Sequence, residues 1–243
     1  MQKYRTLFLW MIVPLLAMQL GIAMDYWGDF TDNTWAVHIH YWSATLWYVF
    51  LIVQPWLATH GRMEQHRTNG MIGLFLAGGL AIGGMSMLHR DLVYVQMATD
   101  DPVRFGPFKP EFFYGVAVVE LVMVILFTLA VIMAILKRKQ IEEHAWWLVS
   151  TAFIIMMPAF GRGVQNVFIL VQADQWPDIS IIPATIVSQA IIIGLTLVAA
   201  WMYGKLKHPA TFCAIAVNGL AIFTFQIGST PWIQSLLVAL IKG

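Results

Sequence analysis

The sequence has few charged residues and almost no cysteine. Only 11% of its 243 residues are charged, and its one cysteine, Cys213, lies inside an apolar run. A soluble domain carries about 25% charged residues, so this composition argues against an ordinary soluble protein. A single cysteine cannot form an intrachain disulfide, and it therefore gives no information about the redox compartment.

Several motifs that would indicate a particular chemistry are also missing. The sequence contains no HExxH, CxxC, P-loop or GxSxG pattern. The last long apolar run has no lysine before Lys242, which argues against a retinal Schiff base. A net charge of +1 gives no indication of nucleic-acid binding. The sequence therefore predicts no enzyme class.

Long apolar runs recur along the whole chain. Hydrophobic residues make up 59% of the sequence, and a run of about 20 residues crosses a hydrocarbon core of about 30 Å. We expect one all-α domain over residues 1–243, a polytopic bundle of about seven transmembrane helices. The predicted spans are residues 7–24, 36–58, 70–88, 112–136, 145–171, 180–204 and 209–228. The short apolar piece 232–241 is expected to extend the last helix beyond a kink or to lie at the interface.

The basic residues predict the orientation. With the N-terminus inside, nine of the fourteen lysines and arginines are on the inner side: Lys3, Arg5, Arg62, Arg67, Lys137, Arg138, Lys139, Lys205 and Lys207. This asymmetry favours an N-inside, C-outside protein of a bacterial inner membrane, with the longest loop, 89–111, outside. Lys3 and Arg5 before an apolar run also resemble a signal peptide. The run is long enough to span, so we expect a helix.

Two charged residues, Glu120 and Arg162, lie deep inside predicted spans. At 1.5 Å per residue they are roughly 14–15 Å from the outer ends of their helices. Charged groups at such depth are costly and indicate a functional site. Asn166 and Gln189 fall at a similar depth, which suggests an outward-opening cavity for a small molecule or a quinone. The alternative is a purely structural ion pair between Glu120 and Arg162.

The histidines fall into two layers. His38, His40 and His89 are predicted near the outer surface, and His60, His66, His144 and His208 near the inner surface. Neutral imidazole binds haem iron, zinc and copper. The pair His66 and His144, and with less room the pair His40 and His89, could each hold a b-type haem, with Arg67 or Lys139 near the inner propionates. Alternatively, the histidines simply lie in the headgroup zone.

Three further patterns accompany these residues. His144, Thr151 and Arg162 are predicted to share one face of a continuous helix, as a polar stripe. Met85 and Met87 with His89 offer a copper alternative. A stripe of small residues indicates close helix packing or room for a flat cofactor. This stripe consists of Gly70, Gly73, Ala77, Ala81 and Gly84.

Part of the chain resembles an uncharacterised family of bacterial multi-helix membrane proteins of unknown function. The matching pieces lie within 36–165: His40 with Gln54, His66-Arg67-x-x-Gly70, Glu143-His144-x-x-Trp147, and Arg162. The resemblance implies that His66, His144 and Arg162 act as a set, although the methionine usual after the second histidine is not evident. The two histidine layers also look loosely like cytochrome b561-type carriers, without their ligand spacing.

Three hypotheses about function remain open at this point. The first is a membrane redox carrier that binds haem, or a metal, through histidines at the helix ends. The second is a transporter or sensor that uses the cavity around Glu120 and Arg162. The third is a structural subunit of a membrane complex.

Overall fold

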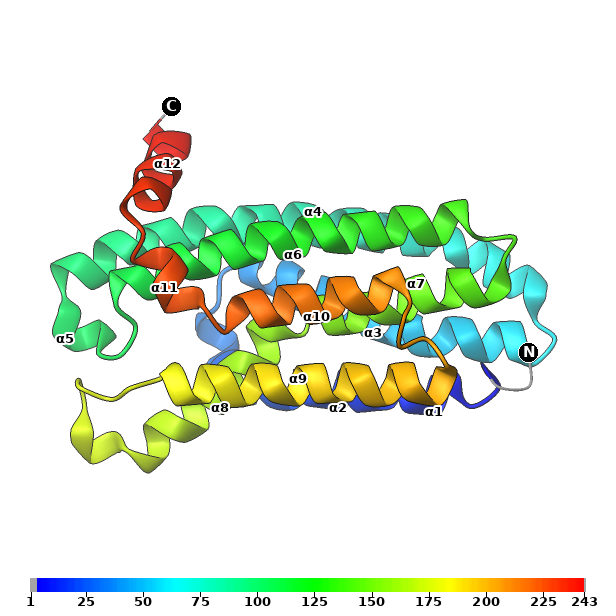
Figure 1. The fold of residues 1–243 in the computed structure, drawn as a ribbon, viewed down its shortest axis with the longest axis horizontal. Helices are drawn as coiled ribbons and strands as arrows, with labels where there is room; N and C mark the ends of the chain where they lie inside the picture. The colour runs from blue at the N-terminus through cyan, green and yellow to red at the C-terminus, as the bar shows by residue number, and fades with distance from the viewer. Residues whose placement is uncertain (1–3, 243) are drawn as a thin grey trace.

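The structure, a computed structural model, describes residues 4–242 as helices joined by turns (Figure 1). Helices make up 84% of the chain and the described residues contain no strand, which confirms the all-α prediction. The α-helices are α1 (Leu7–Trp10), α2 (Ile12–Gly21), α3 (Trp35–Thr59), α4 (Met63–Asp100), α5 (Pro102–Phe105), α6 (Pro110–Leu136), α7 (Ile141–Ile154), α8 (Met157–Val171), α9 (Ile182–Tyr203), α10 (Pro209–Ala221), α11 (Thr224–Gly228) and α12 (Pro231–Lys242). Short π and 3-10 turns are η2 (Ala23–Trp27), η3 (Phe30–Asp32) and η4 (Ala173–Gln175).

Five segments are long and apolar enough to cross a membrane. They are α3, α4, α6, the stretch Ile141–Val171 that holds α7 and α8, and α9. Large apolar side chains on these helices point away from the protein: Phe75 is 79% exposed, Ile82 74% and Trp201 71%. Such a surface needs lipid as its solvent. The fold is therefore that of an integral membrane protein.

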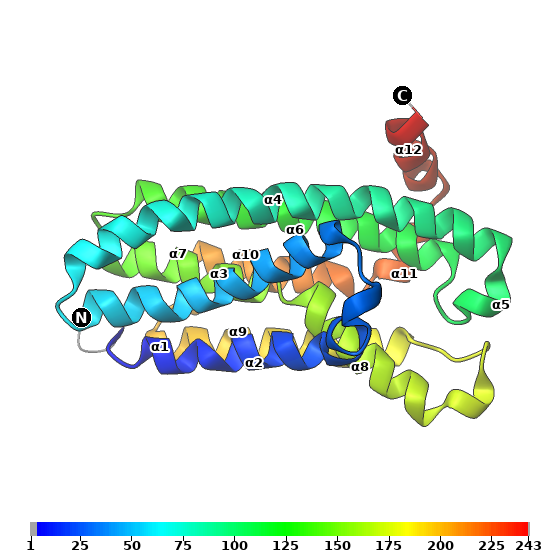
Figure 2. The ribbon, with the colours of Figure 1, turned by 180° about the vertical axis from the view of Figure 1, so that it is seen from behind.

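Four helices surround one interior. Helix α4 packs against α3 and α6, and α7 packs against the same two helices, so that α4 and α7 face each other diagonally. Helix α10 packs on α6, α7 and α9, while α2 packs on α3 and α8. The helices run side by side along the long axis (Figures 1 and 2). We call the end with turns 60–62, 137–140 and 204–208 the basic end, and the end with α5 and 172–181 the acidic end.

Helix α4 is much longer than the predicted span 70–88. It runs for 38 residues to Asp100, about 57 Å at 1.5 Å per residue. Most of the predicted loop 89–111 is therefore wrong. The helix continues because Asp91, Val95 and Ala98 are buried at helical spacing, and Val95 and Ala98 pack with Phe113 of α6. Asp91, expected in an outer loop, is instead inside the protein.

The predicted helix 145–171 is broken. Helix α7 ends at Ile154 and α8 begins at Met157, with Pro158 in its first turn. Proline lacks the N–H that would continue the ladder of α7. The predicted continuous stripe from His144 to Arg162 is therefore wrong, because the two residues belong to different helices. Figure 1 shows α8 leaving the direction of α7.

The C-terminal segment also changes direction. Helices α10 and α11 cover the predicted span 209–228 with a break at residues 222–223. Helix α12 then stands away from the bundle (Figure 1). Its residue Trp232 is 67% exposed. The apolar piece 232–241 thus does not extend α11 along the bundle.

Glycines bring helix backbones together at two contacts. A Cβ added to Gly115 of α6 would collide with the carbonyl oxygen of Thr224 in α11, and one added to Gly228 with that of Glu111. Gly21 of α2 and Gly163 of α8 meet in the same way. The small-residue stripe on α4 has a different role. There Gly73 accommodates the ring of Phe50 and Gly84 the side chain of Val124.

We expect Gly115→Leu to lower the melting temperature of the detergent-solubilised protein, because the new side chain overlaps the backbone of α11. Overpacking of this kind costs about 1–3 kcal/mol or more. The matched control is Gly194→Leu on α9, where the added Cβ has no atom of another described helix within 4 Å. Equal melting temperatures for the two variants would contradict the close α6–α11 contact.

Candidate functional site

Two histidines meet at the basic end of the bundle. His66 lies in the first turn of α4 and His144 in the first turn of α7. Their ring centroids are 6.2 Å apart and the ring planes are nearly perpendicular, at 86°. Both side chains are half-buried. Because α4 and α7 are diagonal neighbours, the two rings approach each other from opposite sides of the four-helix interior.

Each ring is oriented by a backbone carbonyl of one of the other two helices. His66 Nδ1 donates to the carbonyl oxygen of Gln54 in α3, at 3.3 Å. His144 Nδ1 donates to the carbonyl oxygen of Ala134 in α6, at 2.8 Å. A carbonyl only accepts, so Nδ1 carries a proton, and in the neutral imidazole the lone pair is then on Nε2. This second contact is how proteins orient a histidine ligand.

Next to this pair, Gln54 has a buried side-chain amide without hydrogen-bond partners among the described residues. It is 3% exposed, and neither its Oε1 nor its Nε2 has a hydrogen-bond partner in the part of the chain that the structure describes. A buried amide without partners costs about 1–3 kcal/mol for each group. At the basic end of the bundle, α3 and α4 therefore combine oriented imidazole with unused hydrogen-bonding capacity.

The other two histidines of the basic end, His60 and His208, make hydrogen bonds to neighbouring protein groups. His60 is exposed, stacks on Trp56 at 5.2 Å and donates to its carbonyl oxygen at 2.9 Å. His208 Nδ1 accepts from the backbone N–H of Ala210 at 3.1 Å, so its Nε2 donates to Glu143, at 2.9 Å. Neither ring faces His66 or His144.

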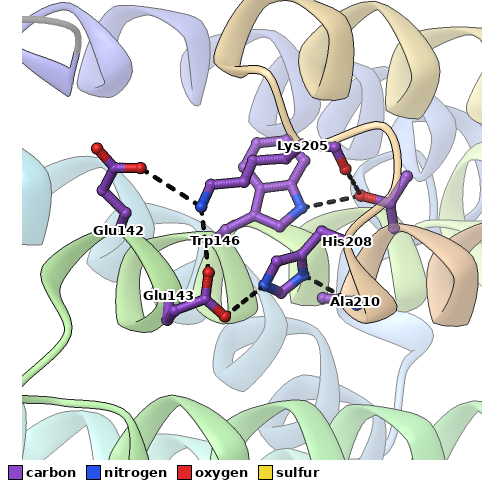
Figure 3. A network of polar contacts seen from close by, with 7 residues as sticks. Glu142, Glu143, Trp146, Lys205, His208 and Ala210 are labelled. Carbon is purple, nitrogen blue, oxygen red and sulfur yellow. Dashed lines mark hydrogen bonds and ion pairs between the residues drawn. The ribbon is translucent and has the colours of Figure 1, made fainter.

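A polar network ties α7 to the turn between α9 and α10 (Figure 3). Lys205 pairs with Glu142 at 3.5 Å and with Glu143 at 3.2 Å. Trp146 Nε1 donates to Thr211 Oγ1 at 2.9 Å, and Thr211 Oγ1 donates to the carbonyl oxygen of Lys205 at 2.8 Å. Trp146 and Thr211 are fully buried. The network holds α7, and with it His144, in place.

Tyr4 lies next to this network. Its ring stacks on Tyr203, with centroids 5.3 Å apart. Burial, and then the nearby Glu142 and Glu143, raise the pKa of Tyr4 to about 12. The phenol therefore stays neutral at physiological pH.

We expect Thr211→Val to destabilise the protein by about 1–3 kcal/mol, because it leaves the buried Trp146 N–H without an acceptor. The measurement is thermal unfolding in detergent. Thr68→Val is the matched control, since Thr68 is exposed and its hydroxyl donates only to the carbonyl oxygen of Glu64. A control as unstable as Thr211→Val would show that the network contributes nothing.

A cavity of about 270 Å³ lies toward the acidic end. Glu120 of α6, Arg162 and Asn166 of α8, and Gln189 of α9 all line it. The break at Pro158 and the neighbouring α6 and α9 bring these residues together. Asp91 of α4 lines the same cavity and is a residue that the sequence analysis missed.

The ion pair at this cavity differs from the expected one. Arg162 Nε pairs with Asp25 Oδ2 at 3.3 Å, and Arg162 Nη1 donates to the hydroxyl of Tyr41 at 3.0 Å. Asn166 Nδ2 donates to Asp25 Oδ1 at 2.7 Å. The contact between Gly21 and Gly163 explains this. Asp25 lies one turn after Gly21, whereas Arg162 directly precedes Gly163 and Asn166 follows it by about one turn. A direct Glu120–Arg162 ion pair is not formed in the described chain.

The predicted outer pair, His40 and His89, have environments that differ from each other. His40 lies against Gly83 and lines a smaller cavity of about 60 Å³, and its Nδ1 has no partner among residues 4–242. His89 is exposed and is not a lining residue of either described cavity. Met85 is 48% exposed whereas Met87 is 6% exposed. Residues two apart on a helix point to opposite sides, so Met85, Met87 and His89 do not converge on a copper ion.

Comparisons with protein-family models, curated proteins and solved structures return no match. The resemblance to an uncharacterised membrane family thus stays a prediction. Among the described residues, no group of three or more His, Cys, Asp or Glu side chains could hold a metal ion. The two sites that the geometry offers are the His66–His144 pair and the cavity at the acidic end.

Proposed function

We propose that this chain is a b-type haem protein of the bacterial inner membrane that carries electrons. His66 and His144 are the two residues that would hold the haem iron. The observation that carries the proposal is the meeting of these two rings across the bundle, each oriented by a backbone carbonyl.

The distance between the rings fits two imidazoles that hold one metal ion between them. An imidazole nitrogen binds a metal ion at about 2 Å, and the ring centroid lies about 1 Å farther away, so two rings on opposite sides of one ion are about 6 Å apart. The rings of His66 and His144 are 6.2 Å apart. Two imidazoles also suffice for a haem iron, whose porphyrin supplies the other ligands, whereas zinc takes three or four protein ligands.

The surroundings of the pair fit such a group. Gly70 follows His66 by one helical turn on the same face of α4, and no atom of another described helix lies within 4 Å of a Cβ added there. Gln54 supplies an amide in need of partners. Arg67 and Lys139 are exposed at the same end and offer cations to propionates. Haem, when bound, supplies the one-electron couple, and the Nδ1 hydrogen bonds make the ligands more basic.

The proposal includes an orientation. The basic end faces the cytoplasm, because positive charge collects there. The segment α1–α2 and the segment α10–α11 complete the count of seven spans, which leaves the N-terminus inside and α12 on the outer side. The haem then lies close to the cytoplasmic surface.

We expect the protein purified from a haem-sufficient host to show a Soret band, with about one haem per chain. His66→Ala and His144→Ala should each abolish that band or change the spin state, because one axial nitrogen is lost. His60→Ala, at the same end of the bundle, is the matched control and should retain the spectrum. A colourless wild-type protein, or the wild-type haem content and spin state in all three variants, would refute haem binding by this pair.

A second variant tests the site without removing a ligand. Gly70→Leu fills the open space next to His66, so haem content should fall while the melting temperature of the haem-free protein stays unchanged. Gly194→Leu, on a different helix, should leave the haem content at the wild-type value. Full haem occupancy in Gly70→Leu would place the porphyrin elsewhere.

The orientation gives a separate prediction. An alkaline phosphatase reporter fused after Gly243 should be active, because the C-terminus is proposed to be periplasmic. The same reporter inserted in the 137–140 turn should be inactive, whereas a cytoplasmic fluorescent reporter there should be bright. A cytoplasmic C-terminus would mean that α10–α11 does not span.

A second candidate function is transport or sensing of a small ligand. The observation that favours it is the cavity at the acidic end, which four helices line with charged and amide side chains. Membership of a larger membrane complex stays a prediction from the sequence.

A further inference from the structure

The cavity at the acidic end is lined by hydrogen-bond acceptors without donors. Asp91 Oδ2, Glu120 Oε2 and Gln189 Oε1 are buried, and none has a hydrogen-bond partner within residues 4–242. The three residues come from α4, α6 and α9, and they are 1%, 4% and 1% exposed. All three line the same cavity. What is missing from this cavity is therefore a donor.

The charges at the cavity do not balance. Arg90 donates to Asp91 Oδ1 at 2.9 Å, and Arg162 pairs with Asp25 at 3.3 Å. These are the ionisable groups that line the cavity with Glu120. With all five groups ionised, three carboxylates and two guanidinium groups leave one negative charge, and Glu120 is the carboxyl group without an ion-pair partner in the described chain. A cationic ligand would balance the charge of these groups.

The remaining wall is aromatic. Phe105, Phe108, Phe112, Phe113 and Tyr94 line the cavity. They form one cluster, with the rings of Phe105 and Phe113 6.0 Å apart and those of Phe108 and Phe112 5.4 Å apart. Aromatic faces attract organic cations, and combined with a carboxylate they recognise ammonium groups.

We propose that this cavity binds a small organic molecule that carries a primary ammonium group and an apolar body. An ammonium group has three N–H donors, which match the acceptors on Asp91, Glu120 and Gln189. The apolar body lies against the phenylalanine cluster. This site is separate from the haem proposed at the basic end.

Two other ligand classes fit less well. A metal ion such as calcium takes six to eight oxygen ligands, and here three unmet oxygens share a cavity with a large apolar wall. An oxidised quinone carries acceptors only, so it would leave all three protein acceptors without donors.

A proton is the competing occupant. The carboxyl groups of Asp91 and Glu120 line the same cavity, so one proton shared between them would satisfy two of the three acceptors. When the ammonium ion binds, it displaces that proton to solvent and the total charge is conserved. Ammonium binding is therefore expected to release about one proton for each ligand bound.

The test is isothermal titration calorimetry of the full chain in lipid nanodiscs, with benzylammonium as the probe. Benzyl alcohol, the neutral analogue of similar shape, is the ligand control. We expect benzylammonium to bind at least tenfold more tightly than benzyl alcohol. Titrations in buffers of different ionisation enthalpy should report the released proton. If benzylammonium binds no better than benzyl alcohol, Asp91 and Glu120 hold only a proton and the proposal is wrong.

Variants identify the site. Glu120→Gln should weaken benzylammonium binding at least tenfold and abolish proton release, and Gln189→Met should weaken binding while proton release remains. Asp100→Asn, an exposed carboxyl group at the same end, is the matched control and should bind as the wild type does. Equal binding by Glu120→Gln and wild type would overturn the assignment. Neither His66 nor His144 lines this cavity, so failure of the haem proposal leaves the benzylammonium result unaffected.

Discussion

The hydrocarbon core of a membrane offers no water, so polar groups placed there must find partners inside the protein. Helix α7 is where many of them do so. Trp47 Nε1 donates to Thr151 at 3.0 Å, Tyr48 donates to the carbonyl oxygen of Ala152 at 2.7 Å, and Asn218 donates to that of Phe153 at 3.0 Å. These bonds tie α3 and α10 to α7. The position of His144, at the start of this helix, depends on them.

Several buried polar groups without partners in the described chain lie at the two ends of the interior. Gln54 is at the basic end, and Asp91, Glu120 and Gln189 are at the acidic end. Polar groups without hydrogen-bond partners are costly in a low-dielectric interior, and they often mark functional sites. The two ends differ in chemistry. The basic end offers two imidazole rings, which suit a metal centre when neutral, and the acidic end offers oxygen acceptors without partners among the described residues, which suit a donor.

Close backbone contacts set the shape of the acidic end. The meeting of Gly115 with Thr224 brings α11 onto α6, and Thr224 then lines the cavity. The meeting of Gly21 with Gly163 places Asp25 beside Arg162. A side chain at any of these glycines would push the helices apart, so the ion pair and the cavity wall depend on residues that carry no chemistry themselves.

The sequence by itself determined the features that depend on composition and local pattern. Long apolar runs predicted the helices and the lipid-facing surface, because the membrane requires them. The places of His66 and His144 at the starts of helices on the basic side predicted a shared depth. Glu120, Arg162, Asn166 and Gln189 were singled out because polar groups at one depth inside apolar runs are unusual. These inferences needed no knowledge of which helices are neighbours.

Only the tertiary structure decided which of these groups meet. The diagonal placement of α4 and α7 brings two histidines together that are 78 residues apart in the chain (144 minus 66). The break before Pro158 separates His144 from Arg162, and the length of α4 carries Asp91 into the cavity. Arg162 pairs with Asp25 and not with Glu120 because of a glycine contact between α2 and α8. Helix order, breaks and backbone contacts result from packing over the whole chain, which no local pattern records.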